Sequence, residues 1–531
     1  MKRTKLLSAA MVAALAMSAG ACDEGLAELN ENPNAPTDVP AQFLLPQAIQ
    51  STVEYAGYNT WFTLEFTGLF AQHWAKIQYT DEDRYELRPN VVDGFWNTFY
   101  PGPMKDWQTI IDKGQETGIV NHEAIGVIGK VYVAHLITDI WGDVPYSQAL
   151  KADDPDEPIT APAYDAQQAI YTAMLAELDA AAALLDPARR TFGQEDLIYG
   201  GDVTQWEKFA NSLRLRFAMR ISDVAPGVAQ PIVEALATRP LILDNEDNFT
   251  LHYLDTAPNR NPLFENAAVG SGSRDDHGVS NTLVNIMGAL NDPRIAVYAE
   301  PAAVADPTAD FVWCGGAGQP VCHVVVGGQI YRGMRNGVLS GDVPEPIGLW
   351  SRPGNHFRAN PDADQPLLTA AEVHFLLAEA AENGWNVGGT AAGHYEAGVR
   401  AAFDMWDGAD GADLGTAAQT AYLAQPGVAY GTPPIGGGDN YELIAEQKWL
   451  ALYTTSPEAY AELRRTGYPD EAIASMDASI INVIPGRIAY PDIEQSLNTA
   501  NLAAAIAAQS ALGVDGTYAG RVWWDTTPQV R

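Results

Sequence analysis

Apolar residues recur at helical spacing in seven segments of this chain. The segments are 125–136, 171–185, 206–221, 373–381, 395–406, 444–452 and an alanine-rich run at 500–512. Apolar side chains three or four positions apart form one stripe along a helix, and each stripe must be buried against another element. Breakers such as Asn383-Gly384 separate consecutive stripes. The pattern predicts a mostly α fold of tetratricopeptide-like helix pairs, each packed on the next, although the repeat consensus is not literally present.

The middle of the chain, residues 225–366, has a different composition. It is rich in Gly, Pro, Asn and Asp and carries few helical stripes. These residues favour turns and loops. We therefore expect a loop-rich insertion with short strands between two helical blocks. Both blocks and the insertion would belong to a single domain at 47–531.

The N-terminus has the pattern of an export signal. A basic start at Lys2, Arg3 and Lys5 precedes an apolar run at 6–17 and a small-residue stretch that ends at Cys22. The run is shorter than the roughly 18 apolar residues that a membrane span needs, so residues 1–21 are predicted to be a signal peptide. The position of Cys22 predicts lipidation, with residues 22–46 as a proline-rich tether. The alternative is ordinary secretion with a spare cysteine.

The other two cysteines, Cys314 and Cys322, flank a Gly-rich turn. In an oxidising compartment this spacing predicts a disulfide that closes the loop. His323 follows directly and raises the alternative of a metal site, but two thiols and one imidazole are a thin ligand set.

The charge of the chain excludes one large class of partner. With 67 acidic and 31 basic residues the net charge is −36. Nucleic-acid binding requires clustered Lys and Arg, which the sequence lacks. The acidity is typical of a protein that must stay soluble in a salty compartment.

Aromatic and polar residues mix without a clean stripe in the first hundred residues. A sugar has apolar C–H faces, which a Trp or Tyr ring covers, and hydroxyls, which polar side chains satisfy. The same rings could instead pack in the core of a first helix pair. The candidate ligand-binding residues are Trp74, Tyr79, Arg84, Trp96, Asn97 and Tyr100, with Trp313 and Trp350 in loops of the insertion.

Catalytic and cofactor signatures are weak. Glu372 and Glu379 would share one face of a helix, which allows a paired-carboxylate glycosidase as an alternative. The sequence has no Gly-x-Ser-x-Gly elbow, His-Glu-x-x-His or phosphate loop. We expect no catalytic residue and no cofactor. The acidic runs 244–248 and 81–83 leave calcium as an alternative, although neither matches an EF-hand loop.

A set of motifs in fixed order covers nearly the whole chain beyond the signal. They include Asn32-Pro33-Asn34, Trp141-Gly142-Asp143-Val144-Pro145-Tyr146, Trp206-Glu207-Lys208-Phe209-Ala210-Asn211, Asn291-Asp292-Pro293-Arg294, Gln447-Lys448-Trp449 and Arg464-Arg465-Thr466-Gly467-Tyr468-Pro469. In this order the chain resembles the SusD/RagB family of nutrient-binding lipoproteins.

The resemblance implies a protein that is lipid-anchored at the bacterial outer membrane, on the cell surface. Its partner would be a SusC-like TonB-dependent transporter, to which it delivers a captured oligosaccharide; a peptide is the alternative cargo. The region around Trp96 and Tyr100 would lie near the ligand pocket. Such a protein is not an enzyme. A surface glycosidase or a non-binding helical scaffold remains the alternative from another class.

Overall fold

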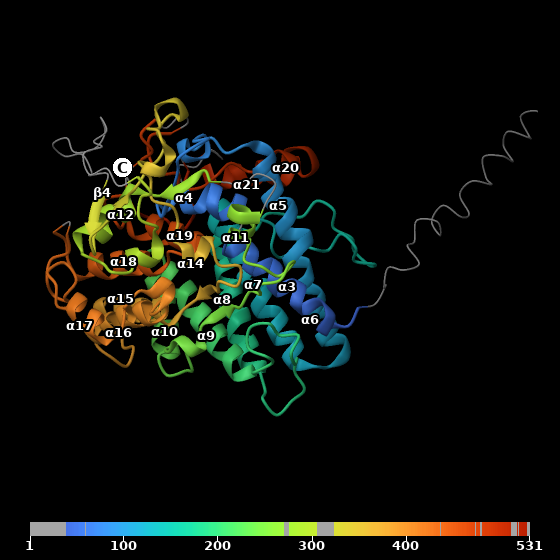
Figure 1. Cartoon of the computed structure of the whole chain (residues 1–531). Helices are drawn as coiled ribbons and strands as arrows, with labels where there is room; N and C mark the ends of the chain where they lie inside the picture. Colours follow the sequence, from blue (N-terminus) through green and yellow to red (C-terminus); the bar gives the residue numbers. More distant parts are fainter. Residues whose placement is uncertain are drawn as a thin grey trace, which may run out of the picture.

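The computed structural model describes residues 39–58, 60–269, 275–304, 323–435, 437–472, 474–477, 481–510, 518 and 520–527. Helices dominate it (Figure 1). The longer ones are α3 (Ala41–Ala56), α5 (Pro89–Phe99), α6 (Lys105–Thr117), α7 (Val120–Trp141), α8 (Gln167–Leu184), α9 (Val203–Arg220), α10 (Pro226–Leu236), α12 (Asn281–Ala289), α15 (Ala370–Glu382), α16 (Ala391–Asp404), α17 (Thr416–Leu423), α18 (Asn440–Ala451), α19 (Ser456–Thr466) and α21 (Thr499–Ser510). Shorter helices are α4 (Gly68–Phe70), α11 (Pro262–Phe264), α13 (Ile295–Tyr298), α14 (Asn355–Arg358) and α20 (Asp492–Leu497).

Short 3₁₀- and π-helical segments and three small sheets connect these helices. The segments are η1 (Thr60–Thr67), η2 (Glu82–Arg84), η3 (Tyr100–Met104), η4 (Asn245–Asp247), η5 (Glu265–Val269), η6 (Ser340–Asp342), η7 (Ile347–Leu349) and η8 (Ala409–Gly411). The strands are β1 (Trp74–Lys76), β2 (Phe249–Leu251), β3 (His277–Val279), β4 (His323–Val326), β5 (Gln329–Arg332) and β6 (Gln365–Leu368). They form three antiparallel pairs, β1 with β3, β2 with β6 and β4 with β5.

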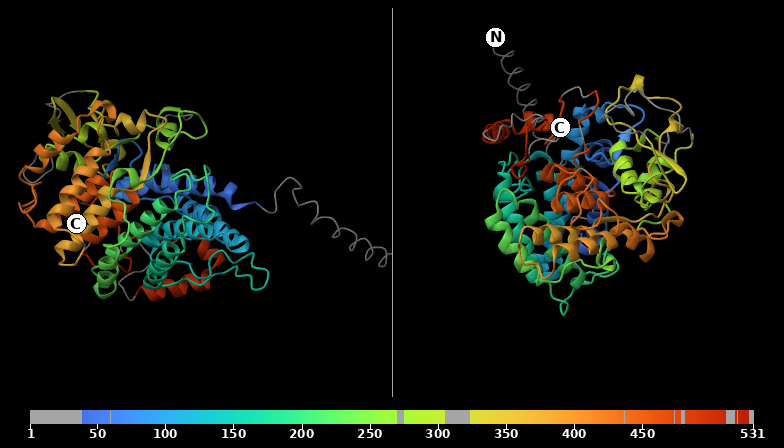
Figure 2. Two further views of the ribbon diagram at one scale, coloured as in Figure 1. Left: turned by 90° about the horizontal axis from the view of Figure 1, so that it is seen from below. Right: turned by 90° about the vertical axis from the view of Figure 1, so that its left-hand side faces the viewer.

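Two arrays of helices form the body of the molecule. In the first, α6 packs on α7, α7 on α8, α8 on α9 and α9 on α10. In the second, α15 packs on α16 and α18, and α18 packs on α19. Figure 2 shows the blue-to-green helices on one side and the orange helices, with the yellow-green loops, on the other. The predicted mostly α fold of packed helix pairs is confirmed.

Several helices begin at a residue whose side chain caps them. Asp202 accepts a hydrogen bond from the Thr204 N–H at the start of α9, and Thr369 accepts one from the Glu372 N–H at the start of α15. Asp439 does the same for α18. Such caps satisfy backbone donors that lack a partner within the helix.

Close packing in the first array depends on a glycine. A Cβ atom on Gly129 of α7 would lie 2.3 Å from the ring of Trp107 on α6. The indole of Trp107 in turn donates to Thr52 Oγ1 of α3 at 2.8 Å. The absent side chain therefore lets three helices meet around one Trp ring.

Helix α7 is the only helix among the described residues that is long and apolar enough to cross a membrane. Most of its length is buried against neighbouring helices. Burial of this kind is typical of the central helix of a core.

Buried ion pairs cross between the arrays and also stabilise the second one. Arg216 of α9 holds Glu372 of α15 at 2.6 Å across the two arrays, and Arg465 of α19 holds Glu379 of α15 at 2.6 Å within the second array. All four side chains are buried. Burial raises the pKa of Glu372 despite the nearby Arg216 guanidinium. The two glutamates that allowed a glycosidase alternative are therefore structural partners of arginines and face no open cleft.

The insertion and the tether differ in part from expectation. Four of the six described strands fall within 225–366 and β6 begins there, but the helices α10 and α12 also lie in this range. A short α10, with Pro226 in its first turn, is too brief to show a long stripe. The helix α3 begins at Ala41, inside the predicted tether of 22–46, and continues through Pro46. Its apolar face, with Leu45, Ile49 and Val53, is buried, and this burial outweighs the helix-breaking tendency of proline.

Candidate ligand-binding surface

Three segments that are distant in sequence meet beside β1. They are the turn at 77–85, the loop at 335–342 and the segment 474–477. The Thr80 N–H donates to Ser340 Oγ at 3.0 Å. The Met476 N–H donates to the Asn336 carbonyl at 2.9 Å. These bonds fix the three segments as one unit, which we call the Tyr79 surface and which lies at the upper edge of the molecule in Figure 1.

Each segment of the Tyr79 surface exposes one large apolar side chain. Tyr79 is 70% exposed, Met476 45% and Leu339 40%. Their neighbours in sequence are joined by hydrogen bonds, including one from the Leu339 N–H to Asp477 Oδ2 at 3.3 Å. Single exposed apolar residues are common on proteins, but three on segments bonded to one another form a patch that can bind a ligand.

The backbone of Tyr79 has a left-handed conformation, with a φ of 53°. This region costs a residue with a side chain about 1–2 kcal/mol. The strain is opposed by the hydrogen bonds of Thr80 to Ser340 on the adjacent loop. The fold therefore holds an exposed tyrosine ring on an ordered turn, a geometry that suits a binding platform.

Arg84 supplies a cation at the border of this surface. Its Nε donates to the Asp477 carbonyl at 2.9 Å, and its guanidinium lies 3.2 Å from Glu86 and 3.7 Å from Asp81. Asp81 is largely exposed. The surface thus combines apolar side chains with charged groups that can bond to hydroxyls or amides.

Two predicted tryptophans support the surface from below. Trp74, in β1, is buried and stacks on Tyr453 with ring centroids 5.3 Å apart. Trp350 is buried in a small cluster with Ala75, Ile77 and Val338. Its indole donates to the Pro344 carbonyl at 3.2 Å. Neither ring is open to a ligand in this structure; both shape the base on which the turn and loop rest.

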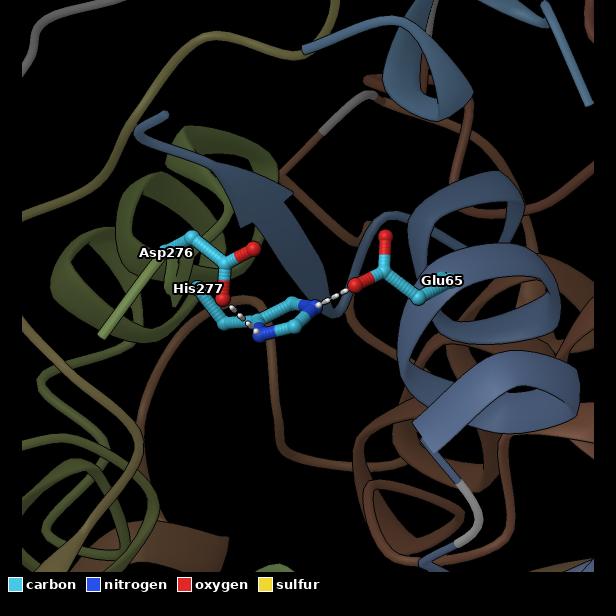
Figure 3. Close-up of side chains that lie close together, drawn as sticks. All are labelled: Glu65, Asp276 and His277. Carbon is cyan, nitrogen blue, oxygen red and sulfur yellow. Dashed lines mark ion pairs between the residues drawn. The ribbon is translucent and has the colours of Figure 1, made fainter. Parts of the chain in front are cut away.

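A group of charged side chains is buried under β1 and β3 (Figure 3). The Lys76 ammonium lies 2.9 Å from Glu65 and 2.7 Å from Asp276. The His277 ring bridges the same carboxylates, with Nε2 3.4 Å from Glu65 and Nδ1 3.3 Å from Asp276. These four residues connect η1 to the β1–β3 pair.

The charged groups in this network shift one another's pKa values. Burial disfavours the charge on Asp276, but His277 and Lys76 outweigh it and hold the pKa of Asp276 well below its usual range. Burial and the Lys76 charge oppose protonation of His277, yet Glu65 and Asp276 raise the pKa of its ring. Glu65, Asp276 and His277 are close enough to share a metal ion. Because the Lys76 ammonium already pairs with both carboxylates, the group is better described as a buried ion network.

A second candidate site lies around Trp96 and Tyr100. They line a hollow of about 510 Å³ together with Pro101, Lys105, Pro145, Ala149, Leu150, Ala152, Asp153, Ile159, Thr160, Pro162 and Glu494. Trp96 is buried between Trp141 and Tyr164, and the Tyr100 hydroxyl donates to the Pro145 carbonyl at 2.8 Å. Both side chains therefore already contact other residues of the protein. Their exposed area is small compared with that of Tyr79.

The structure therefore divides the predicted ligand-binding residues. Tyr79 and Arg84 lie on the Tyr79 surface, with Trp74 and Trp350 beneath it. Trp96 and Tyr100 line the separate hollow, and Asn97 is exposed but does not line it. Trp313, Cys22, Cys314 and Cys322 lie outside the described residues, so their predicted roles stay predictions. Leu339 and Met476 escaped the sequence reasoning because isolated apolar residues in loops carry no periodic signal.

The acidic runs considered for calcium have other partners. In 81–83, the Asp83 carboxylate accepts hydrogen bonds from the Lys76 N–H at 3.0 Å and from Asn336 Nδ2 at 2.7 Å. Burial raises the pKa of Asp83 to about 6. In 244–248, Asp247 pairs with Lys208 at 2.5 Å. The calcium alternative remains an untested prediction.

Comparison with known proteins decides the family. A family model described as SusD-like, starch-binding and associating with the outer membrane matches residues 33–491. The chain belongs to this family. The resemblance drawn from the motifs is confirmed, and membership places this SusD-like protein at the outer membrane.

Solved structures agree with this assignment. A chitin-binding protein is 29% identical, with a TM-score of 0.75 over 92% of this chain and 99% of that one. A chitin-binding SusD homologue from Flavobacterium johnsoniae is 26% identical, with a TM-score of 0.71 over 91% and 99%. A SusD homologue from Bacteroides fragilis is 25% identical, with a TM-score of 0.73 over 92% and 100%. Among curated proteins, none matches the chain.

Proposed function

We propose that this SusD-like protein captures chitin-type oligosaccharides, β-linked chains of N-acetylglucosamine, on the Tyr79 surface. The observation that carries the proposal is the exposed ring of Tyr79 on a strained but well-bonded turn. Two solved relatives described as chitin-binding, at 29% and 26% identity, support this class of sugar.

The chemistry of the surface fits such a ligand. The C–H face of a pyranose ring can stack on Tyr79, as apolar faces do on aromatic rings. The acetyl methyl group is apolar and can contact Leu339 or Met476. Arg84 and Asp81 at the border can bond to the amide and the hydroxyls. An unacetylated glucose chain offers no methyl group and should bind more weakly.

Calorimetric titration with chitin, starch and peptide oligomers tests the ligand, and Tyr79→Ala tests the place. Covering about 60 Å² of ring at roughly 25 cal/mol per Å² is worth about 1.5 kcal/mol, so Tyr79→Ala should weaken binding about tenfold. Phe43→Ala is the matched control, because Phe43 on α3 is 68% exposed. Loss of binding in Trp96→Ala but not in Tyr79→Ala would place the ligand in the hollow instead. Binding of peptides alone would exclude the sugar.

We also propose that the protein is anchored by a lipid on Cys22 and delivers its ligand to a TonB-dependent transporter without chemical change. The family description, starch-binding and associating with the outer membrane, supports attachment to that membrane and a binding role. The export-signal pattern that ends at Cys22 supports the lipid anchor. Cys22→Ser should release the protein from the membrane fraction, and co-purification with the transporter should persist in detergent. Shortened oligosaccharide after incubation with the pure protein would contradict the non-enzymatic role.

A further inference from the structure

Two histidines face each other on the helix pair α15–α16, which lies away from the Tyr79 surface in Figure 1. His374 projects from α15 and His394 from α16, and their Nδ1 atoms are 3.4 Å apart. Both rings are half-buried, so solvent reaches the pair. Neither residue takes part in the proposed capture of sugar.

A hydrogen bond fixes the protonation of the first ring. His374 Nε2 lies 3.1 Å from the Leu243 carbonyl oxygen. A carbonyl oxygen only accepts, so Nε2 carries the hydrogen, and Nδ1 of the neutral ring carries the lone pair. Metal-binding histidines are usually oriented in this way, with the other nitrogen donating to a carbonyl or carboxylate.

The spacing of the two nitrogens matches a pair of metal ligands. A tetrahedral zinc ion with Zn–N bonds of about 2.05 Å holds two nitrogens about 3.4 Å apart. The same contact also meets the geometry of a hydrogen bond between the two rings, which a bound metal ion would replace. His394 Nε2 has no hydrogen-bond partner among the described residues.

We propose that His374 and His394 form a binding site for one divalent transition-metal ion, with zinc and copper as the fitting ions. The ion would sit between the two Nδ1 atoms and keep water in its other positions. The two helices pack directly on each other, which holds the ligands in place without the metal.

Calorimetric titration of tag-free protein with Zn²⁺ and Cu²⁺ tests the site. One equivalent should bind, copper more tightly than zinc, as the general order of affinities requires. His374→Ala and His394→Ala should each weaken that equivalent at least tenfold. His252→Ala should leave it unchanged, because His252 is an exposed histidine paired with Asp364 elsewhere.

A crystal soaked in Zn²⁺ gives an answer that does not depend on folding of the variants. We expect an anomalous peak about 2.0–2.1 Å from both Nδ1 atoms. Absence of that peak, or wild-type titration curves in both alanine variants, would overturn the proposal. Because sugar binding uses other residues, its presence or absence leaves this result unaffected.

Discussion

Glu446 on α18 is buried, and neither of its carboxylate oxygens has a hydrogen-bond partner among the described residues. Burial raises the pKa of Glu446 to about 9, and the charges of Glu471, Glu442 and Asp470 add to the effect. Between pH 4.5 and about 9 the folded state therefore keeps a proton that the unfolded chain releases. Stability falls as pH rises through this window, by up to about 1.4 kcal/mol per pH unit.

We expect Glu446→Gln to remove this loss of folding stability at higher pH. The variant should be as stable as the wild type near pH 4, where both side chains are neutral, and more stable at pH 7.5. Thermal unfolding at the two pH values measures the difference. Glu396→Gln on α16 is the control, because Glu396 is exposed. Equal effects of Glu446→Gln at both pH values would contradict the assigned titration.

At the scale of single residues, the sequence predicted which aromatic residues could bind a ligand, but not which of their rings are exposed. Tyr79 and Trp74 stand five positions apart in a stretch that mixes aromatic and polar residues. Only the pairing of β1 with β3 decides that Trp74 is buried, while the positive φ of Tyr79 turns its ring outward. The first depends on Val279 and the second on Ser340, each more than two hundred residues away, which no local pattern reveals.

At the scale of elements, the helices with long apolar stripes were predictable. The stripe at 125–136 lies inside α7, and the stripe at 206–221 coincides with α9 up to its C-cap residue Ile221. The short helix α12 and the proline-containing α3 were not predicted, because tertiary burial rather than local propensity stabilises them.

The contact of α6 with α7 yields a prediction at this scale. Gly129→Ala would place a methyl group 2.3 Å from the Trp107 ring, and overpacking of this kind costs about 1–3 kcal/mol of unfolding free energy. Gly94→Ala on α5 is the matched control, because no atom lies within 4 Å of its new Cβ. The control should be neutral or stabilising by about 0.5–1 kcal/mol, as alanine favours helices. Chemical denaturation measures both, and equal changes would contradict the packing account.

At the scale of the whole molecule, two helical arrays joined by buried ion pairs carry a loop-rich region, and the Tyr79 surface forms where that region meets the N-terminal segment. The helical arrays were predictable from periodicity. The surface was not, because the loop at 335–342 and the segment 474–477 meet the turn at 77–85 through hydrogen bonds between distant parts of the chain, which have no local signal.

The most direct test of the central claim is a crystal structure with a trimer of β-linked N-acetylglucosamine. The account predicts a sugar ring stacked on Tyr79, with an acetyl methyl group against Leu339 or Met476. A trimer bound in the hollow beside Trp96, with the Tyr79 surface empty, would contradict it.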